Sequence, residues 1–472
     1  MTELGLKTLE NLMFRTLPQD LADQLASWRE ELRAQYAGAA SDELRNQAAE
    51  LLAENAIDLQ SVLADWNLKN RSRHGDQALS DEQLAEESAK SIAILDEFGR
   101  KELTDHVQRE VAAIASSNLA RLARMALAGE VNTYWGNDYA AHLREAMRKG
   151  AAMVTTNPVL VNVARTEDPQ YWTPVRDRLQ ERYSDYDPVQ LGYAMTIEVV
   201  LANARLLRPI WELTDRAMGY VSLQLSPKEA HNVEAMVEGA RWVWERLHVG
   251  LGGTPNCVFK VPGTKAGITV AETLTSEAMG INVTVNFSLP QQIAFAGAIE
   301  NNSTTKVCYR TQMDGRLDDP VGEELQAAGV SDWEEVKTWC TTAIRQREYR
   351  MLCLPPEEGG LGFKKSIPLP ASGRGPWNIL RSIQNGPVPI FLTVFPNRIE
   401  EFDSEPRELD PNGMWAELPE GYLDKLYKSK LFRQGYEPDG MTVDEFDDYL
   451  PVVKTLTQFA EGYDEFIAWV AG

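Results

Sequence analysis

A lysine inside an apolar segment is the first residue that could do chemistry. Lys260 lies in the octapeptide Cys257–Thr264, a short apolar run closed by proline and glycine, which is typical of a strand buried on both faces. Burial lowers the pKa of a lysine because it disfavours the ammonium form, and a neutral amine can attack a carbonyl to form a Schiff base. The alternative is a lysine near the strand end whose amine extends to solvent.

Further polar residues occur in or just after successive apolar segments. They are Thr155 to Asn157, Gln224, Lys260 itself, Asn282 to Ser288, Thr311 to Arg316 and Ala371 to Arg374. Each run alone is typical of an ordinary turn. Because six of them follow six strand-like segments in chain order, they indicate one site at the ends of neighbouring strands.

The segment from about residue 130 predicts the strands that position these residues. Strands are expected at 131–134, 153–156, 220–225, 257–261, 281–285, 307–311, 367–371 and 390–394. Amphipathic helices are expected between most of them, at 139–149, 228–247, 266–279 and 290–299, and a helix at 456–470 would close the domain. This alternation predicts an α/β fold, a parallel (β/α)₈ TIM barrel with its chemistry at the C-terminal strand ends.

Residues 1–127 have a different pattern, which predicts an all-helical N-terminal extension. Glycine and proline are scarce there, and apolar residues recur at three- and four-residue spacing, with helices expected at 21–36, 41–54 and 80–98. We therefore expect two domains, 1–127 and the barrel 128–472. The helical region would be a cap or an oligomerisation element, and the sequence leaves open whether the chain forms a homo-oligomer.

Composition excludes several classes of partner. A net charge of −23 argues against nucleic acid, because phosphate backbones are bound by basic surfaces. The five histidines have no metal-ligand spacing, so no metal is expected. The first 14 residues have no export signal and no segment is long enough to span a membrane. These patterns, with four cysteines of no paired spacing, predict a cytoplasmic protein with buried thiols.

The barrel segment resembles the transaldolase family over roughly residues 128–472. The matching segments are Val154–Pro158, Gly219–Leu223, Phe259–Thr264, Gly280–Ser288 and Leu392–Pro396. The resemblance implies a (β/α)₈ barrel without metal or cofactor and a Schiff-base lysine. It also implies transfer of a dihydroxyacetone unit between sugar phosphates, as in the pentose phosphate pathway.

The resemblance also implies a role for each matching residue. Lys260 would be the nucleophile, and Thr284 would help to hold the catalytic water. The substrate-binding residues would be Asn157, Asn282, Ser288 and Thr311, and the phosphate would be held by Arg316, Ser372 and Arg374. Guanidinium groups suit phosphate because they donate two parallel hydrogen bonds.

Two positions depart from the family pattern. Asn132 is the best match to the aspartate that serves as general acid/base, and an asparagine cannot exchange a proton. Gln224 occupies the place of a glutamate, and it can orient a water but cannot accept its proton. Met313 stands where the fructose 6-phosphate aldolase branch has a tyrosine. Glu130 and Asp138 are nearby carboxylates, and Asp138 is expected to cap the following helix.

Three functions therefore remain open. The first is a transaldolase-like enzyme. The second is a Schiff-base enzyme with altered chemistry or substrate, because the usual carboxylates are absent from the matched positions. The third is a barrel that binds a sugar phosphate without catalysis and acts through its helical region.

Overall fold

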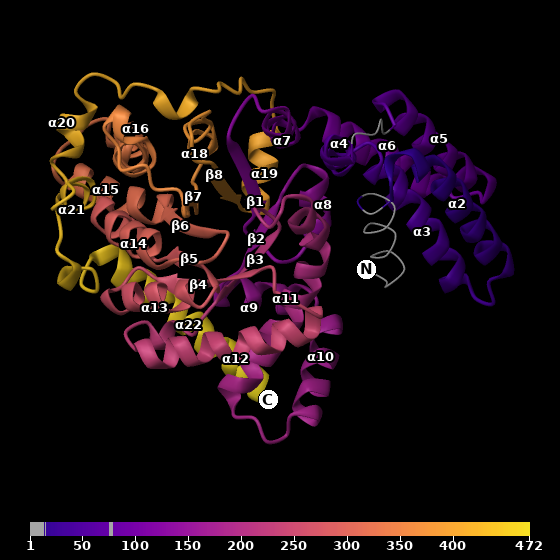
Figure 1. The fold of residues 1–472 in the computed structure, drawn as a ribbon, viewed down its shortest axis with the longest axis horizontal. Helices are drawn as coiled ribbons and strands as arrows, with labels where there is room; N and C mark the ends of the chain where they lie inside the picture. Colours follow the sequence, from indigo (N-terminus) through magenta and orange to yellow (C-terminus); the bar gives the residue numbers. More distant parts are fainter. Residues whose placement is uncertain (1–13, 15, 75–78) are drawn as a thin grey trace.

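The computed structural model describes residues 14, 16–74 and 79–472. It contains a helical N-terminal region beside a barrel (Figure 1). Residues 1–13, where the sequence predicts no export signal, lie outside the described residues. The N-terminal elements are η2 Pro18–Asp20, α2 Leu21–Gly38, α3 Asp42–Asp58, α4 Val62–His74, α5 Asp81–Glu97, α6 Lys101–Ser116 and α7 Asn118–Ala128.

Eight parallel strands form a nearly closed barrel. They are β1 Thr133–Asn137, β2 Met153–Thr155, β3 Tyr220–Gln224, β4 Cys257–Pro262, β5 Gly280–Thr284, β6 Cys308–Met313, β7 Ser366–Ala371 and β8 Ile390–Val394. Their order is β7-β6-β5-β4-β3-β2-β1-β8, and β7 lies against β8. The predicted TIM barrel with N-terminal helices is confirmed.

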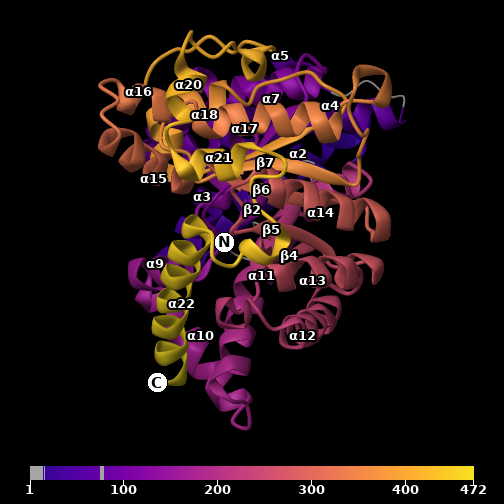
Figure 2. The same cartoon turned by 90° about the vertical axis from the view of Figure 1, so that its left-hand side faces the viewer.

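Helices surround the strands. Those of the first half are α8 Leu143–Arg148, α9 Pro158–Glu167, α10 Pro169–Arg182, α11 Pro188–Leu213, η3 Pro227–Glu229, α12 Val233–Leu251, α13 Lys265–Ser276 and α14 Leu289–Asn302. Those of the second half are α15 Asp314–Ala327, α16 Trp333–Lys337, α17 Cys340–Glu348, η4 Tyr349–Cys353, η5 Pro356–Glu358, α18 Pro376–Leu380, α19 Pro396–Asp403, η6 Gly413–Trp415, α20 Tyr422–Leu426, α21 Lys430–Tyr436, η7 Val443–Glu445 and α22 Leu450–Ala471. Helix α22 packs beside α9 and α11 (Figure 2).

The first strand differs from the prediction. It begins at Thr133 instead of residue 131, and it pairs residue by residue with β8 as far as Asn137. Gly136 suggests a turn in the sequence, but it lies inside the strand. A Cβ at Gly136 would lie 2.7 Å from the carbonyl oxygen of Met153 in β2, so the close approach of the two strands requires glycine. Asp138 therefore follows the strand directly.

The helix after this strand also begins later than predicted. It starts at Leu143 and not at residue 139, and the preceding His142 has a left-handed φ of 55°. His142 occupies the N-cap position of α8. The prediction that Asp138 caps this helix is therefore wrong, and its carboxyl group is available for another role.

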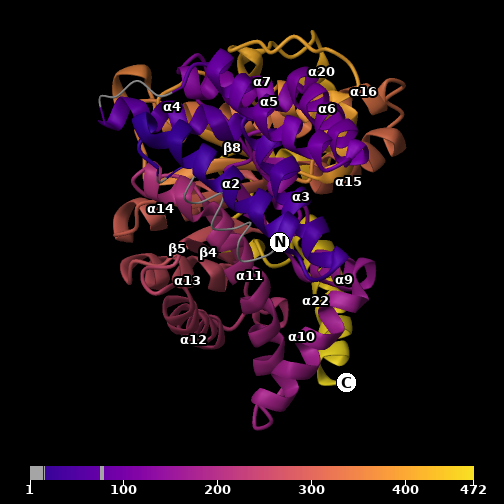
Figure 3. The same cartoon turned by 90° about the vertical axis from the view of Figure 1, so that its right-hand side faces the viewer.

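A buried ion cluster joins the N-terminal helices to the barrel. Figure 3 shows these helices facing the viewer, in front of the barrel. Asp58 of α3 accepts hydrogen bonds from Arg144 Nη2 at 2.5 Å and from Arg148 Nε at 2.8 Å, both in α8. Burial by itself raises the pKa of Asp58, but the two guanidinium groups outweigh burial and hold this pKa below its usual value. The cluster therefore stabilises the contact between α3 and α8.

We predict that Asp58→Ala lowers the free energy of unfolding by about 3–5 kcal/mol, because Arg144 and Arg148 lose their buried counter-charge and keep only the partly exposed Glu54. Asp464→Ala is the matched control. It removes an exposed pair with Lys228 at 2.7 Å, and such pairs contribute about 1 kcal/mol or less. Urea unfolding followed by tryptophan fluorescence measures both variants. Equal small losses would contradict the structural role of the cluster.

Candidate active site

Lys260 lines a small cavity at the C-terminal ends of the strands. The lysine is 7% exposed and pairs in register with Gln224 of β3 and Asn282 of β5. The cavity encloses about 20 Å³ and is lined by Asp138, Thr155, Asn157, Lys260, Asn282, Thr284, Thr311, Met313, Leu369, Ala371, Ser372, Thr393 and Phe459. A volume of this size holds about one water molecule. Substrate entry would therefore require the covering side chains to move.

Asp138 and Lys260 interact electrostatically across this cavity. Burial lowers the pKa of Lys260, while the charge of Asp138 opposes that change and Arg316 adds to it. Burial raises the pKa of Asp138, while Lys260, the Thr155 hydroxyl and Arg316 oppose the rise. The Thr155 hydroxyl donates a hydrogen bond to Asp138 Oδ1. Burial thus moves both groups towards their neutral forms, which suits a nucleophilic amine and a proton-exchanging carboxyl.

Two side chains orient the amide of Asn282. Its Nδ2 donates to Ser222 Oγ at 3.1 Å, and its Oδ1 accepts from Thr311 Oγ1 at 2.7 Å. Thr284 follows two residues later on the same face of β5, and its hydroxyl lies 3.8 Å from the sulfur of Met313. Asn157 also lines the cavity. The structure thus brings these four predicted residues, Asn157, Asn282, Thr284 and Thr311, together around Lys260.

Gln224 ends β3, directly opposite Lys260 in the strand pairing. Its Oε1 is buried and has no hydrogen-bond partner among the described residues. A buried acceptor without a partner is costly. An acceptor of this kind suits a water or a hydroxyl, although Gln224 is not among the residues that line the cavity.

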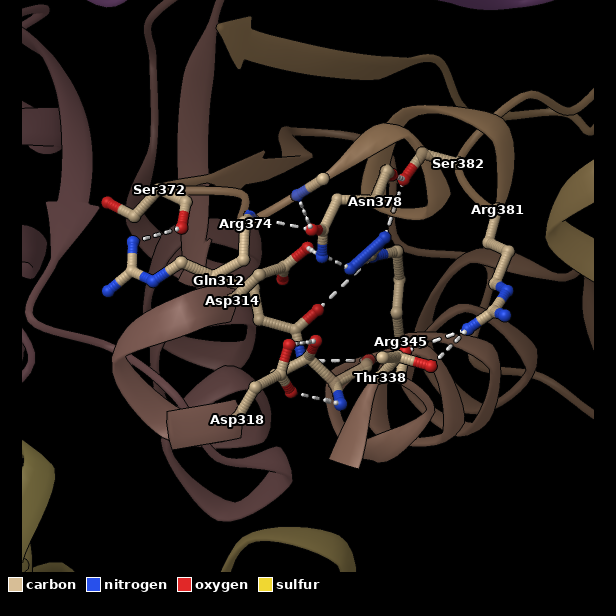
Figure 4. A network of polar contacts seen from close by, with 12 residues as sticks. Gln312, Asp314, Asp318, Thr338, Arg345, Ser372, Arg374, Asn378, Arg381 and Ser382 are labelled. Carbon is tan, nitrogen blue, oxygen red and sulfur yellow. Dashed lines mark hydrogen bonds and ion pairs between the residues drawn. The ribbon is translucent and has the colours of Figure 1, made fainter. Parts of the chain in front are cut away.

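Arg316 and Arg374 interact electrostatically beside the cavity. Burial lowers the pKa of Arg316, and the nearby charge of Arg374 lowers it further. Arg316 Nη1 donates to Gln458 Oε1 at 2.6 Å, and Arg374 Nε donates to Asp319 Oδ2 at 2.9 Å. Ser372 lines the cavity and lies in the same loop as Arg374 (Figure 4). An anion placed between the arginines would offset their repulsion.

The structure does not bring Asn132 or Ser288 to the cavity. Asn132 precedes β1, at the opposite end of the barrel, and its Nδ2 donates to the Gly386 carbonyl at 2.9 Å. The match of Asn132 to the family's aspartate rested on the predicted strand 131–134, which lies too early in the chain. Ser288 caps α14, where its Oγ accepts from the Gln291 amide at 3.3 Å and donates to Gln291 Oε1 at 2.9 Å.

Two residues of the cavity are not given their place from the sequence: Asp138 is named as a nearby carboxylate but expected to cap a helix, and Phe459 is not singled out. Asp138 could have been found if the first strand had been extended through Gly136, which places the carboxylate at the strand end as in the other segments. Phe459 lies on the C-terminal helix α22, and the cation of Arg316 lies 5.2 Å from its ring centre. No local pattern indicates that Phe459 covers the cavity.

A second cavity lies between the N-terminal helices and the barrel. It has a volume of about 1130 Å³ and is lined in part by Glu50 of α3, His142 and Trp469. Of the polar residues singled out in the sequence, Thr156 lines it, but none of the residues to which the resemblance gives a role does. The groups able to do the predicted chemistry therefore surround the smaller cavity.

The structure also bears on metals and membranes. Among the residues that the structure describes, no three histidine, cysteine, aspartate or glutamate side chains gather as a metal site. Within the same residues, every helix is too short or too polar to cross a bilayer. The four cysteines, Cys257, Cys308, Cys340 and Cys353, are buried free thiols.

Comparison with known proteins identifies the family. Regions of the chain resemble transaldolase of Neisseria meningitidis serogroup C (27% identity over 218 residues, 42% of this chain and 60% of the relative). They also resemble transaldolase of Thiobacillus denitrificans (33% over 142 residues, 30% and 37%) and transaldolase 2 of Nostoc punctiforme (28% over 151 residues, 32% and 37%). The aligned parts thus span 60% or less of these relatives. The family model "Transaldolase/Fructose-6-phosphate aldolase" matches residues 138–448, so the chain belongs to this family.

Proposed function

We propose that the protein is a transaldolase-like enzyme that forms a Schiff base between Lys260 and a ketose phosphate. It would then transfer or cleave a dihydroxyacetone unit. The observation that carries the proposal is the buried Lys260 amine beside the buried Asp138 carboxyl in one cavity. Family membership supports the same chemistry.

The first step would be attack of the neutral Lys260 amine on the ketose carbonyl. The resulting carbinolamine takes a proton from the neutral Asp138 carboxyl, loses water and becomes an iminium ion. The Asp138 carboxylate then takes the proton of the C4 hydroxyl while the C3–C4 bond breaks. The bonding electrons move to the iminium nitrogen, which leaves an enamine on Lys260 and releases an aldehyde.

The second half-reaction would reverse these events. The enamine carbon attacks an acceptor aldehyde, and Asp138 returns its proton to the new alkoxide. Water then adds to the iminium carbon, and hydrolysis of the iminium frees the Lys260 amine and the product ketose. Asn157 and Asn282 would bind substrate hydroxyls, and Thr284 would help to hold the water.

The glutamine at position 224 predicts that the steps involving water differ from this scheme. The family's glutamate can accept a proton from the water that enters or leaves the iminium, whereas the amide of Gln224 can only orient it. We infer that proton transfer at this step relies on Asp138 or on solvent. An enzyme of this kind would release its covalent intermediate slowly, or would act on a substrate that supplies the missing group.

Arg316, Ser372 and Arg374 would hold the phosphate of the substrate. Arg316 and Arg374 interact electrostatically, and Ser372, in the same loop as Arg374, lines the cavity. Such a site would place the sugar carbons towards Lys260. A sugar phosphate is therefore the substrate class that we propose.

We predict that borohydride with fructose 6-phosphate leaves a stable adduct on the protein, because reduction fixes an iminium as a secondary amine. Intact mass spectrometry measures the adduct. Lys260→Ala should form none, whereas the control Lys265→Ala, an exposed lysine on α13, should form as much as the parent. An adduct-free parent would support the non-catalytic barrel and contradict this proposal.

We predict that Asp138→Asn lowers kcat by about 10²–10⁴-fold, the usual contribution of a general acid/base. Asn132→Asp should change kcat by less than about threefold, because this side chain is bonded to Gly386 at the other end of the barrel. Steady-state transfer between fructose 6-phosphate and an aldehyde phosphate measures both. A rise in activity in Asn132→Asp would restore Asn132 as the position of the missing base.

We predict that Asp138→Asn also lowers the pKa of Lys260, because the carboxylate charge stabilises the ammonium form. Only the neutral amine reacts with cyanate, so the rate of Lys260 carbamylation rises with pH through this pKa. Peptide mass spectrometry over a pH series should show the midpoint at lower pH in Asp138→Asn. A midpoint that stays in place or moves up would show that the two groups do not interact.

A further inference from the structure

One buried side chain, Asn378, bonds the backbone of the loop after β7. Asn378 Oδ1 accepts hydrogen bonds from the backbone amides of Arg374 at 2.8 Å and Gly375 at 3.2 Å (Figure 4). Asn378 is 4% exposed and does not line the cavity around Lys260. It therefore contacts the backbone of the residue proposed to bind phosphate without facing the substrate.

Asn378 is itself oriented by a buried ion pair. Its Nδ2 donates to Asp314 Oδ2 at 2.9 Å, and Arg345 Nη2 donates to the same oxygen at 2.6 Å. Arg345 of α17 is fixed in turn by Gln312 Oε1 at 3.2 Å and Ser382 Oγ at 2.5 Å. Charge-assisted bonds of this kind are stronger and more directional than neutral ones.

A second carboxyl group lies beside this pair. Burial and the neighbouring Asp314 raise the pKa of Asp318 to about 8, and both its oxygens accept hydrogen bonds from Thr341, at 3.1 and 3.2 Å. Burial and Asp314 therefore favour the protonated form of Asp318. The positive charge of Arg345 is therefore paired with Asp314 and not with Asp318.

The loop backbone needs such support. Ser372 has a left-handed φ of 57°, which a side-chain-bearing residue adopts only when its surroundings impose it. Its carbonyl accepts from the Gly315 amide at 3.1 Å and from Arg374 Nη1 at 3.0 Å. A Cβ at Gly315 would lie 2.5 Å from the guanidinium carbon of Arg374, so the loop packs directly against the start of α15.

Asp314 connects the two arginines. It begins α15 two residues before Arg316, and through Asn378 it also orients the loop of Arg374. A buried ionic network is an expensive way to stabilise a barrel, because apolar residues of similar volume often do it better. Positioning of the loop therefore explains the network more simply than stabilisation of the barrel does.

We propose that Asn378, oriented by Asp314 and Arg345, is a positioning residue that arranges Ser372 and Arg374 for a phosphate group. The inference rests on the proposed sugar-phosphate function. It adds that Asn378, which contacts the loop but does not face the substrate, determines the affinity for the phosphorylated end of the substrate. A change at Asn378 should have little effect on the reaction at Lys260.

Asn378→Ala tests the proposal in the full-length chain. Inorganic phosphate is the first probe, and we expect its Kd by calorimetry to rise at least about tenfold because the loop loses both amide bonds. KM for fructose 6-phosphate should rise similarly. The kcat/KM for unphosphorylated fructose should stay within about threefold of the parent, since a general loss of structure would lower both.

Asn256→Ala is the matched control. Asn256 is also a buried asparagine whose Nδ2 donates to two backbone carbonyls, of Ala204 at 2.9 Å and Gly219 at 2.8 Å, but it precedes β4 at the opposite end of the barrel. It should lower thermal stability without changing the Kd for phosphate. Equal rises in Kd in both variants would reduce Asn378 to an ordinary structural residue.

Asp314→Asn distinguishes an effect of positioning from an effect of charge alone. Because it keeps the shape of the side chain, it also serves as the test if Asn378→Ala does not fold. Removing a negative charge near the arginines should tighten phosphate binding if charge alone matters. The proposal expects the opposite, a Kd about fivefold higher, because Asn378 and Arg345 lose their shared charged acceptor. Tighter binding would overturn the proposal.

The outcomes separate this inference from the proposed function. If the parent forms the Lys260 adduct and binds phosphate equally well in Asn378→Ala, the inference fails and the function stands. If Asn378→Ala weakens phosphate binding in a protein that forms no adduct, the inference stands and the catalytic function fails. A parent that does not bind inorganic phosphate and treats fructose and its phosphate alike overturns the inference directly.

Discussion

The burial of an amine and a carboxyl in one cavity is the constraint on which the site depends. Lys260 belongs to β4 and Asp138 follows β1, so these groups meet across the interior of the barrel and not along one strand. Only the curvature of the parallel sheet brings such distant positions together. Burial then shifts both pKa values towards the neutral forms, and the neutral amine is the form of Lys260 that the proposed Schiff base requires.

The sequence predicted the barrel well because most strands are simple apolar runs. The eighth, Ile390–Val394, is continuous in bulky residues, and its bounds agree with the structure. The first, Thr133–Asn137, includes Gly136 and ends in asparagine, which local propensity associates with turns. Contact with Met153 of β2 overrides that propensity. The resulting error of a few residues moved the candidate base from Asp138 to Asn132.

Other parts of the site depend on contacts between distant segments. Phe459 reaches the cavity from the last helix, and Asn378, Asp314 and Arg345 come from three different elements. No spacing rule relates such residues, because their proximity is a property of the closed fold. The division into domains 1–127 and 128–472 and the role of the helical region stay predictions. The Asp58 cluster is one of the contacts through which that region would act on the barrel.

The fate of the ketose oxygen tests the central claim most directly. A Schiff base requires the carbonyl oxygen to leave as water, whereas an enzyme that only polarises the carbonyl retains it. Fructose 6-phosphate labelled with ¹⁸O at its carbonyl should therefore lose the label to solvent in every turnover, far faster than it does without protein. Mass spectrometry of the recovered ketose measures the loss. Exchange at the protein-free rate during active turnover would show that Lys260 does not form an imine.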